Sequence, residues 1–335
     1  MPLKPDGDWR GKRVVVTGAG GFIGSHLTEH LVTLGAETTA FLRYNSRSET
    51  GLIQECPADV RAQIRLVWGD LRDPDSVRRA FQHADVVFHL GALVGIPYSY
   101  ESPRQYVDAN VLGTLNVLEA ARAGEVARVI QTSTSEVYGT PIYTPIDEKH
   151  PLQGQSPYAA TKIGADKLAE SFWRTYGMPV ATLRPFNTFG PRQSERAILP
   201  TIIRQALKGS SIRLGSLAPI RDMNFVTDTV DGFLRIAQCD AALGRVVNIG
   251  SGRGQTVGSM VEAVSKTLGK KLEVVADPDR VRPSASEVEE LIADATLARE
   301  LFGWRSATTF EDGLRATIDY FSHRSVDHDP ARYTV

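Results

Sequence analysis

The side chains best suited to chemistry in this sequence are Tyr158 and Lys162, in the segment SPYAATK. Ser156 and Pro157 precede them and are typical of a helix start, so the pair is expected one turn apart on one helix face. A lysine ammonium close to a phenol favours the phenolate and lowers the pKa of the tyrosine. A tyrosine tuned in this way can remove a proton from an alcohol near neutral pH. Tyr/Lys pairs also occur on helices by chance, so the pair alone does not identify an active site.

A second group of reactive side chains lies upstream, in the segment STSEVYGT that covers residues 133–140. Thr134, Ser135 and Glu136 follow the apolar run RVIQT, which predicts a strand that ends close to them. A carboxylate is costly to bury unless it is paired or used. We therefore expect Glu136 to take part in proton transfer, and the alternative is a partly exposed carboxylate on a loop.

Three glycines, Gly18, Gly21 and Gly24, follow the apolar run RVVVT. That run predicts a buried strand over 13–17, and apolar residues at helical spacing after the glycines predict a helix that ends near Gly35. Without Cβ atoms the backbone can approach a pyrophosphate, which the N-terminus of the helix attracts. A strand, a glycine turn and a helix in this order predict dinucleotide binding, and the alternative is an ordinary tight turn.

The kind of dinucleotide depends on the end of the next predicted strand, residues 37–43. About 20 residues beyond such glycines, NAD-binding proteins place an acid that holds the ribose 2′-hydroxyl. This sequence has Arg43 at that point. An arginine can pair with a 2′-phosphate and so favours NADP, whereas an arginine solvated on a loop would carry no such meaning.

Predicted strands and helices alternate along the first half of the chain. Further strands are expected over 64–70, 85–93 and 128–135, and a helix over 103–124. The alternation predicts an α/β fold, a Rossmann-type doubly wound parallel sheet, with a smaller interleaved C-terminal domain that binds substrate. Ligands of such sheets bind at the carboxyl ends of the strands, which is where Glu136 is expected.

The pattern becomes mixed after about Gly190, and this predicts the domain limits. We assign residues 10–189 and about 225–250 to the nucleotide-binding domain and residues 190–224 and 251–323 to the substrate-binding domain. The two polar ends, 1–9 and 324–335, are expected to be flexible tails.

Composition argues against several classes of function. The formal net charge is −1 over 335 residues, so no global field attracts nucleic acid or a membrane surface. No apolar run approaches the ~18 residues needed to span a bilayer, and the N-terminal segment lacks the apolar core of a signal peptide. Cys56 and Cys239 form neither a disulfide framework nor a metal-ligand pattern, so we expect a cytoplasmic protein without a metal site.

Several motifs together resemble one family. TGAGGFIGSHL, HLGAL, NVLGTLNVLEAA, STSEVYG, YAATK and RPFNTFGPR are similar to those of extended short-chain dehydrogenase/reductases that act on nucleotide sugars, from about Lys12 to about Phe321. The resemblance implies a catalytic triad of Thr134, Tyr158 and Lys162. In it Thr134 bonds to the sugar 4-hydroxyl, Tyr158 removes its proton, and Lys162 holds the nicotinamide ribose.

The same resemblance implies a set of binding residues. The positions that match cofactor-binding ones are Gly18, Gly21, Phe22, Ile23, Gly24, Arg43, Asp70, Leu71, Leu90, Ala92, Tyr158, Lys162 and Pro185. The positions that match contacts of the substrate are Thr134, Asn187, Arg192, Arg221 and Arg282. The expected ligands are NAD or NADP and a nucleotide sugar, and relatives pair the helices 103–123 and 157–176 in a homodimer.

Within this family the chain looks most like the 4,6-dehydratases of legionaminic acid biosynthesis, which act on a nucleotide-linked N-acetylglucosamine. The segments GIPYSYESPRQYVDANVLGTLNV, PLQGQSPYAATKIGADK and RPFNTFGPRQSERAILPTII carry this likeness. Dehydration needs a base near C5 and C6 of the sugar, whereas epimerisation at C4 does not. Glu136 therefore favours elimination of water.

Ser135 departs from the pattern of the dTDP-glucose dehydratases, which have an aspartate there that protonates the leaving group. GDP-mannose dehydratases have Thr-Ser-Glu like this chain, so Glu136 is expected to serve as both base and acid. UDP-glucuronate decarboxylases also have Thr-Ser-Glu, but their Tyr-Asp-Glu-Gly-Lys-Arg segment is replaced here by YAATKIG. A decarboxylase is the first alternative, a 4-epimerase the second, and a catalytically inactive dinucleotide sensor the third.

Overall fold

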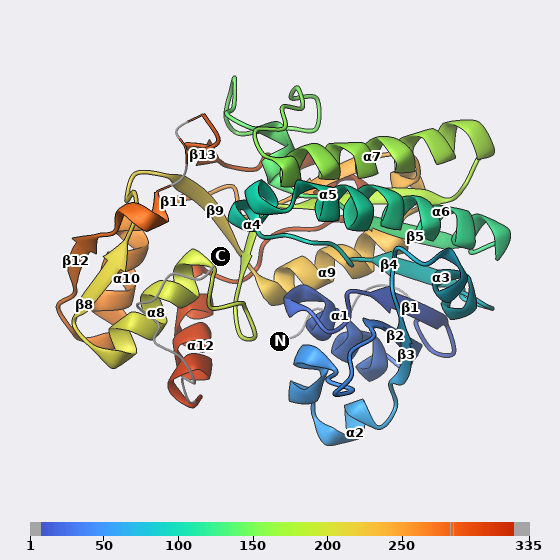
Figure 1. The fold of residues 1–335 in the computed structure, drawn as a ribbon, viewed down its shortest axis with the longest axis horizontal. Helices are drawn as coiled ribbons and strands as arrows, with labels where there is room; N and C mark the ends of the chain where they lie inside the picture. Colours follow the sequence, from blue (N-terminus) through green and yellow to red (C-terminus); the bar gives the residue numbers. More distant parts are fainter. Residues whose placement is uncertain (1–7, 282, 284, 325–335) are drawn as a thin grey trace.

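A parallel sheet of seven strands lies at the centre of the molecule, in the order β10-β6-β5-β4-β1-β2-β3 (Figure 1). The computed structural model describes residues 8–281, 283 and 285–324. The strands of the central sheet are β1 (Arg13–Thr17), β2 (Glu37–Arg43), β3 (Arg65–Gly69), β4 (Val86–His89), β5 (Arg128–Thr132), β6 (Val180–Pro185) and β10 (Val246–Ile249). The strand order reverses between β1 and β4, and ligands bind at such a reversal in doubly wound sheets.

Helices cover both faces of this sheet. Those on one face are α3 (Pro74–Ala80), α6 (Gly113–Ala123) and α7 (Pro157–Tyr176), and those on the other are α1 (Phe22–Thr33), α9 (Val226–Ala237) and α11 (Thr296–Phe302). Successive valines of β1 point to opposite faces, so Val14 and Val16 join the core under α1 and α9 while Val15 joins the core under α3 and α6. The predicted α/β, doubly wound fold is confirmed.

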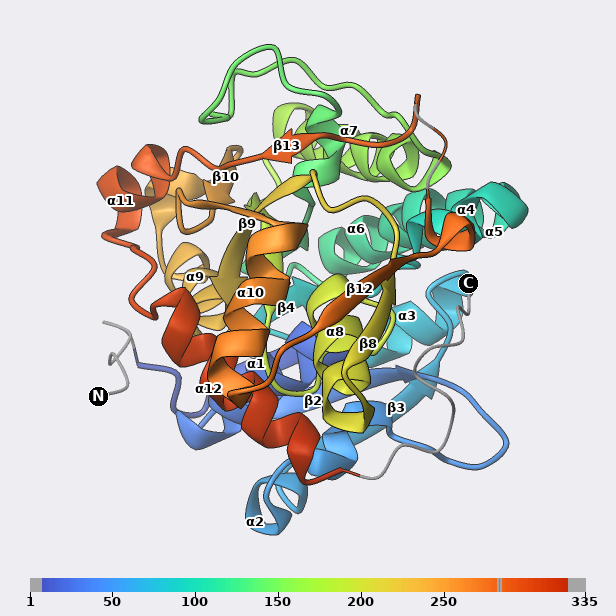
Figure 2. The same ribbon diagram turned by 90° about the vertical axis from the view of Figure 1, so that its left-hand side faces the viewer.

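The chain builds a smaller lobe beyond the carboxyl end of β6. Its strands and helices are β7 (Asn187–Phe189), β8 (Ser211–Leu214), β9 (Ile220–Phe225), β11 (Gly254–Thr256), β12 (Glu273–Ala276), β13 (Glu290–Leu291), α8 (Ile198–Lys208), α10 (Val257–Leu268) and α12 (Phe310–Ser322). Figure 2 shows α8, α10 and α12 gathered beside β8 and β12. Leu199, Met260 and Leu314, one from each helix, are buried together in the core of this lobe.

The chain passes between the central sheet and the smaller lobe more than once. After β9 it returns as α9 and β10, leaves again as β11 and α10, and comes back as α11, which packs against β10. The short α2 (Ala58–Arg61) lies between β2 and β3. The residue limits of the two predicted domains stay a prediction.

The predicted helix over 103–124 is interrupted. It consists of α5 (Pro103–Tyr106), a π-helical turn (Val107–Leu112) and α6. Asn110 in this turn is buried, accepts a hydrogen bond from the Leu93 amide at 2.8 Å and donates to the Leu93 carbonyl at 3.0 Å. Its amide also donates to the Thr161 hydroxyl at 3.1 Å. π turns occur mostly at functional sites, and this one ties the chain after β4 to α7.

The predicted strand over 85–93 is too long, because β4 ends at His89. The backbone of Leu93 pairs with the Asn110 side chain instead of a neighbouring strand. The helix α4 (Ile96–Glu101), which sequence reasoning did not identify, follows directly.

The predicted tails need a correction at two residues. Trp9 is only 3% exposed and packs against Phe88, with ring centroids 5.9 Å apart. Arg324 pairs with the carboxylate of Glu55. Apolar burial and an ion pair therefore hold these two residues, and the rest of both predicted tails, apart from Asp8, lies outside the described residues. Among the helices of the described part of the chain, none is long and apolar enough to cross a membrane.

Candidate active site

The glycine turn between β1 and α1 is too tight for side chains. Gly18 has φ +71, and a Cβ atom on it would lie 2.7 Å from the backbone nitrogen of Gly91. A Cβ atom on Gly24 would lie 2.1 Å from the carbonyl oxygen of Gly18. The backbone of α1 thus packs directly on the end of β1. Phe22 and Ile23 are the first residues of α1, where free N–H groups favour an anion.

A cavity of about 310 Å³ opens beside this turn. The predicted cofactor residues among those that line it are Gly18, Gly21, Arg43, Asp70, Leu71 and Ala92. A cradle of bare backbone next to an apolar cavity fits a dinucleotide. Leu90, which follows β4, and Pro185, the last residue of β6, are not among the lining residues, so their contact with the cofactor stays a prediction.

The charged side chains of this cavity include some that the sequence analysis did not predict. Arg43 lies exposed at the end of β2, as predicted, and Arg72 engages both carboxylate oxygens of Asp70. The pKa of Asp70 is lowered, first by that hydrogen bond. Glu49 also lines the cavity, and sequence reasoning missed it. The amide of Glu49 donates to the side chain of Asn45 at 2.9 Å, which fixes the loop that presents it.

Three candidate catalytic residues follow β5 directly. Thr134 has an extended backbone, and its hydroxyl accepts a hydrogen bond from the Glu136 amide at 3.3 Å. This cap starts a short 3-10 turn over Ser135–Tyr138. Ser135 is 3% exposed, whereas Glu136 is half-buried and so has both protein and solvent around it.

The helix α7 brings Tyr158 and Lys162 to the same place. Ser156 caps it by accepting a hydrogen bond from Ala159 at 3.1 Å, as the sequence predicts. One turn apart, Tyr158 and Lys162 are both buried. The Lys162 ammonium donates to the carbonyl oxygen of Thr132, the last residue of β5, at 2.6 Å.

The expected effect of Lys162 on the pKa of Tyr158 is wrong for the protein alone. Burial raises the pKa of Tyr158, and a hydrogen bond with Thr134 opposes that shift in part. Burial also lowers the pKa of Lys162 to about 8. Both charged forms are thus disfavoured by loss of water, and the phenol keeps its proton at neutral pH.

Glu136 lies within electrostatic reach of the reactive phenol. After burial and Thr134, the largest influence on the pKa of Tyr158 is the negative charge of Glu136, which raises it. The structure therefore brings together four predicted catalytic residues, Thr134, Glu136, Tyr158 and Lys162. A proton on the phenol and a carboxylate beside it are suited to successive proton transfers on one substrate.

Two predicted substrate residues lie where the smaller lobe meets the sheet. Asn187, on β7, has a buried side-chain oxygen without a hydrogen-bond partner among the described residues. Arg221, on β9, is 7% exposed and ion-pairs with Glu287 at 3.1 Å. An unsatisfied amide oxygen and a buried arginine are suited to a hydroxyl donor and an anionic group of a ligand. Arg282 lies outside the described residues.

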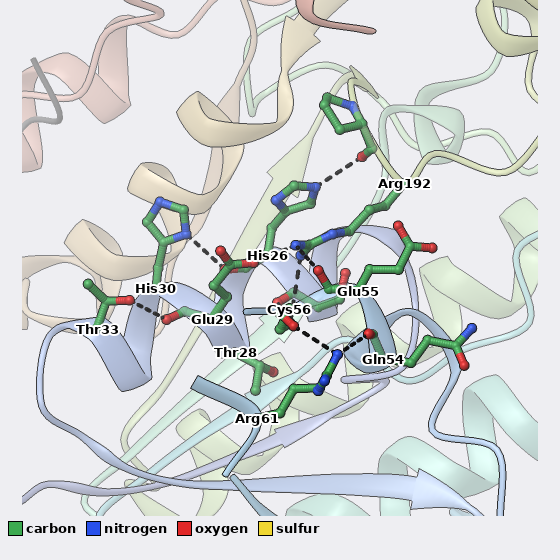
Figure 3. A network of polar contacts seen from close by, with 12 residues as sticks. His26, Thr28, Glu29, His30, Thr33, Gln54, Glu55, Cys56, Arg61 and Arg192 are labelled. Atoms are coloured by element: carbon green, nitrogen blue, oxygen red, sulfur yellow. Dashed lines mark hydrogen bonds and ion pairs between the residues drawn. The ribbon is translucent and has the colours of Figure 1, made fainter. Parts of the chain in front are cut away.

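Arg192 is engaged elsewhere, as Figure 3 shows. Its guanidinium pairs with the carboxylate of Glu29 on α1 at 2.6 Å, and it donates to the backbone oxygen of Glu55 at 3.3 Å. The carbonyl of the preceding Pro191 bonds to the ring of His26 at 3.0 Å. These contacts attach the start of the smaller lobe to α1, and the predicted contact of Arg192 with substrate stays a prediction.

Sequence reasoning missed the aromatic surroundings of Tyr158. Tyr106 packs edge-on against it with ring centroids 6.3 Å apart, and Tyr98 packs on Tyr106 at 6.2 Å. Burial raises the pKa of Tyr106, and the charge of Arg196 opposes that shift. No local pattern predicts these neighbours, because they come from α4, α5 and the segment before α8.

The chain matches the family GDP-mannose 4,6 dehydratase over residues 15–317. The low-salt glycan biosynthesis protein Agl12 of Haloferax volcanii is 32% identical over 317 residues, which cover 92% of this chain and 98% of that protein. A dTDP-glucose 4,6-dehydratase of Streptomyces antibioticus is 30% identical over 95% of each chain. A UDP-N-acetyl-alpha-D-glucosaminuronate decarboxylase of Bacillus cytotoxicus is also 30% identical, over 95% of this chain and 99% of that one.

Solved structures show the same range of activities. The dTDP-glucose 4,6-dehydratase DesIV of Streptomyces venezuelae, with NAD bound, superposes with a TM-score of 0.83 at 28% identity, over 92% of this chain and 96% of that chain. A UDP-glucuronic acid 4-epimerase of Bacillus cereus, in complex with UDP-glucuronic acid and NAD, has a TM-score of 0.84 at 26% identity, over 92% and 98%. The likeness in fold does not separate these reactions, so the distinction depends on the residues of the site.

Proposed function

The chain belongs to the GDP-mannose 4,6-dehydratase family, and from this premise we propose that it is a nucleotide-sugar 4,6-dehydratase. The proposed substrate is UDP- or GDP-N-acetylglucosamine and the product is the 4-keto-6-deoxy sugar. The observation that carries the proposal is the carboxylate of Glu136, whose charge acts on the phenol of Tyr158. Epimerisation at C4 needs no such carboxylate, whereas elimination across C5 and C6 needs a base there.

Each of the proposed catalytic residues has a part in one or more proton transfers of the reaction. Bound NAD(P) supplies a hydride acceptor for C4 and a hydride donor for C6. Tyr158 acts in its phenolate form, so the phenol first gives up its own proton to solvent and then takes the proton of the 4-hydroxyl, which Thr134 orients by a hydrogen bond. The ketone then acidifies C5, and Glu136 takes that proton. Glu136 passes this proton to the C6 hydroxyl, which leaves as water. After C6 has been reduced, C5 takes a proton from solvent through the half-buried Glu136, and Tyr158 releases the 4-hydroxyl proton to solvent, so that the protons balance.

The serine at position 135 determines which group acts as the acid in the elimination step. This residue is buried and carries no acidic proton at neutral pH, so it cannot replace the aspartate of dTDP-glucose dehydratases. Glu136 is half-buried and already holds the C5 proton when the hydroxyl must leave. One carboxyl group therefore serves both steps in this proposal.

A decarboxylase is the second candidate. Its support is a relative of that kind, which is as similar to this chain as the dehydratase is. An epimerase ranks below both, because it leaves Glu136 without a role.

Product masses separate these candidates. The purified protein is incubated with UDP-N-acetylglucosamine, GDP-N-acetylglucosamine and UDP-glucuronate in separate reactions, and each product is weighed by mass spectrometry. We expect loss of one water from an N-acetylglucosamine nucleotide. Loss of carbon dioxide from UDP-glucuronate establishes the decarboxylase instead, and an isomer of unchanged mass establishes the epimerase.

We also propose NAD as the cofactor, against the lean to NADP that Arg43 suggests. The related structures named above hold NAD, and Glu49 shares the cavity with Arg43. A carboxylate can accept the ribose hydroxyls and repels a 2′-phosphate. In this proposal Glu49 therefore replaces the acid that NAD-binding proteins have at the position of Arg43.

Glu49→Gln should weaken NAD binding about tenfold, since a hydrogen bond to a charged group contributes about 1.5–3 kcal/mol. The same change should lower the ratio of the Kd for NADP to the Kd for NAD. Titration of nucleotide-free protein with both dinucleotides gives the two dissociation constants.

Arg47→Gln is the matched control for Glu49→Gln. The side chain of Arg47 is 84% exposed and ion-pairs with Glu49 at 3.6 Å, but it does not line the cavity. Equal Kd ratios in Glu49→Gln and the parent protein would remove the assigned role of Glu49.

A homodimer is part of the proposal. Val107 and Leu112, in the turn between α5 and α6, have 45% and 47% of their surface exposed, and α6 lies beside α7. A second copy that paired these helices would bury both side chains. Sedimentation of the protein and of Leu112→Glu measures the effect, and dissociation of the variant is the expected result.

A further inference from the structure

A third residue on the inner face of α7 lies one turn beyond the lysine. Tyr158, Lys162 and Asp166 follow each other at intervals of four residues, and all three side chains are buried. Asp166 has no role in the proposed reaction. It accepts a hydrogen bond from the Ser133 hydroxyl at 2.6 Å and one from the Arg184 guanidinium at 2.7 Å.

Arg184 on β6 fixes the other side of this carboxylate. It is 2% exposed, donates to the Ser133 hydroxyl at 3.2 Å and donates to the Tyr138 hydroxyl at 2.6 Å. The Ser133 hydroxyl therefore accepts a hydrogen bond from Arg184 and donates one to Asp166, so the direction of both hydrogen bonds is determined. Cation and carboxylate pair tightly here because neither has access to water.

The contacts of α7 fall on consecutive residues at the end of β5. Lys162 bonds to the carbonyl oxygen of Thr132, Asp166 to the hydroxyl of Ser133, and Tyr158 to the hydroxyl of Thr134. The bond between Asp166 and Ser133 thus lies between the two bonds that involve reactive groups. It holds the backbone segment from which the carbonyl for Lys162 and the hydroxyl for Tyr158 project.

Several charged and titratable groups act around Lys162. Asp166 on α7 raises the pKa of Lys162 against the larger effect of burial. On β4, burial lowers the pKa of His89 to about 3, so this ring is neutral. Tyr158 carries a proton at neutral pH, and the remaining charges are Glu136, which acts on Tyr158, and Arg184, which is paired with Asp166.

We propose that Asp166 and Arg184 form a charge-balancing pair that positions Lys162, in which the Asp166 carboxylate, one turn of α7 from the ammonium, favours its charged form and Arg184, paired with Asp166, limits this effect. Asp166 is thus a positioning residue. The importance of Lys162 for turnover rests on the proposed function, whereas the charge balance itself does not.

The test measures the titration of Lys162 directly. Lysine labelled with ¹³C at Cε is followed by NMR against pH in nucleotide-free protein, and the signal missing from Lys162→Met identifies the residue. We expect Asp166→Asn to lower the titration midpoint by about one pH unit and Arg184→Gln to raise it by about one unit. Opposite shifts distinguish a charge effect from a loss of packing.

Two further variants keep the test decisive. Asp166→Asn leaves Arg184 without a carboxylate and can reduce folding, so the double variant Asp166→Asn/Arg184→Gln removes both charges and keeps an acceptor for Ser133. Its midpoint should return to within a few tenths of a unit of the parent value. Asp231→Asn, which breaks the ion pair of Asp231 with Arg235 on α9, is the control and should leave Lys162 unchanged.

The results separate this inference from the proposed function. Midpoints that agree in all folded variants would overturn the role of Asp166 and Arg184, whatever reaction the protein catalyses. Shifts of the expected sign support it even if the product masses identify another reaction. In the active protein the pH at which kcat/KM stops rising should move with the NMR midpoint.

Discussion

Replacing Tyr158 with phenylalanine should lower kcat by about 10²- to 10⁴-fold, the usual contribution of a positioned acid or base. The change removes one hydroxyl that hydrogen-bonds to Thr134, and the ring keeps its packing with Ile96 and Tyr106, so the fold should be retained. Substrate affinity should change only a few-fold, because the lost interaction acts in the proton-transfer step and not on the bound substrate. The measurement is the rate of product formation at saturating substrate together with the Kd of the nucleotide sugar.

The pH dependence of the parent protein gives an independent view of the same residue. Burial raises the pKa of Tyr158, so the phenolate is scarce at neutral pH and its fraction, and with it the rate, grows as the pH increases. Burial lowers the pKa of Lys162 to about 8, so above that pH the loss of its charge offsets the further gain in phenolate. A rate that rises up to about pH 8 and then levels off is expected, and Tyr158→Phe should lose the rise.

Tyr106→Phe is the control for Tyr158→Phe. The hydroxyl of Tyr106 donates to the carbonyl of Gly95, and the ring lies against that of Tyr158. Its loss should cost about 0.5–1.5 kcal/mol of stability, the usual net worth of one hydrogen bond, and leave most of the turnover. Equal losses of kcat in both variants would mean that packing, and not the Tyr158 proton, limits the reaction.

Glu136→Gln should stop the loss of water while the first oxidation continues. The amide cannot take the C5 proton, so a decrease of at least about 10²-fold in product is expected. Because oxidation at C4 depends on Tyr158 and Thr134, the enzyme should stall after it, and reduced dinucleotide should accumulate on the protein. Absorbance of the reduced nicotinamide in a single turnover and the mass of the product test the two parts of this prediction.

Glu148→Gln is the matched control for Glu136→Gln. Glu148 is another partly buried carboxylate, in the segment between β5 and α7, with its pKa raised by burial, and it accepts a hydrogen bond from the Asn248 amide at 2.8 Å. A glutamine can accept the same bond, so turnover should change little. Unchanged water loss in Glu136→Gln would refute the assignment of the base, and Ser135→Ala would then be the variant to examine.

Local signals in the sequence were enough to predict much of the fold. The cap at Ser156, the glycine turn at Gly18 and the apolar runs of β1 and β5 depend on residues within a few positions of each other. These features were predicted because short-range sterics and hydrogen bonds decide them.

The remaining features depend on partners far along the chain. Arg192 pairs with Glu29, and its contact with Cys56 joins residues 136 positions apart, so neither partner could be predicted from the local sequence. The shift of Tyr158 was predicted with the wrong sign, because the sequence shows its lysine neighbour and not the depth of its burial. The π turn at Asn110 follows from the pairing of one buried amide with Leu93, which no helical period reveals.

Because the chain passes more than once between the central sheet and the smaller lobe, recombination cannot easily exchange this lobe, either in evolution or in protein engineering. The edge strand β10 follows β9 of the smaller lobe in the sequence, and β13 of that lobe follows β10. A single crossover between two related genes therefore cannot exchange the smaller lobe as a unit. It would join a sheet from one parent to an edge strand shaped for the other. New substrate specificity in this architecture should arise through point substitutions and loop changes more readily than through the shuffling of modules.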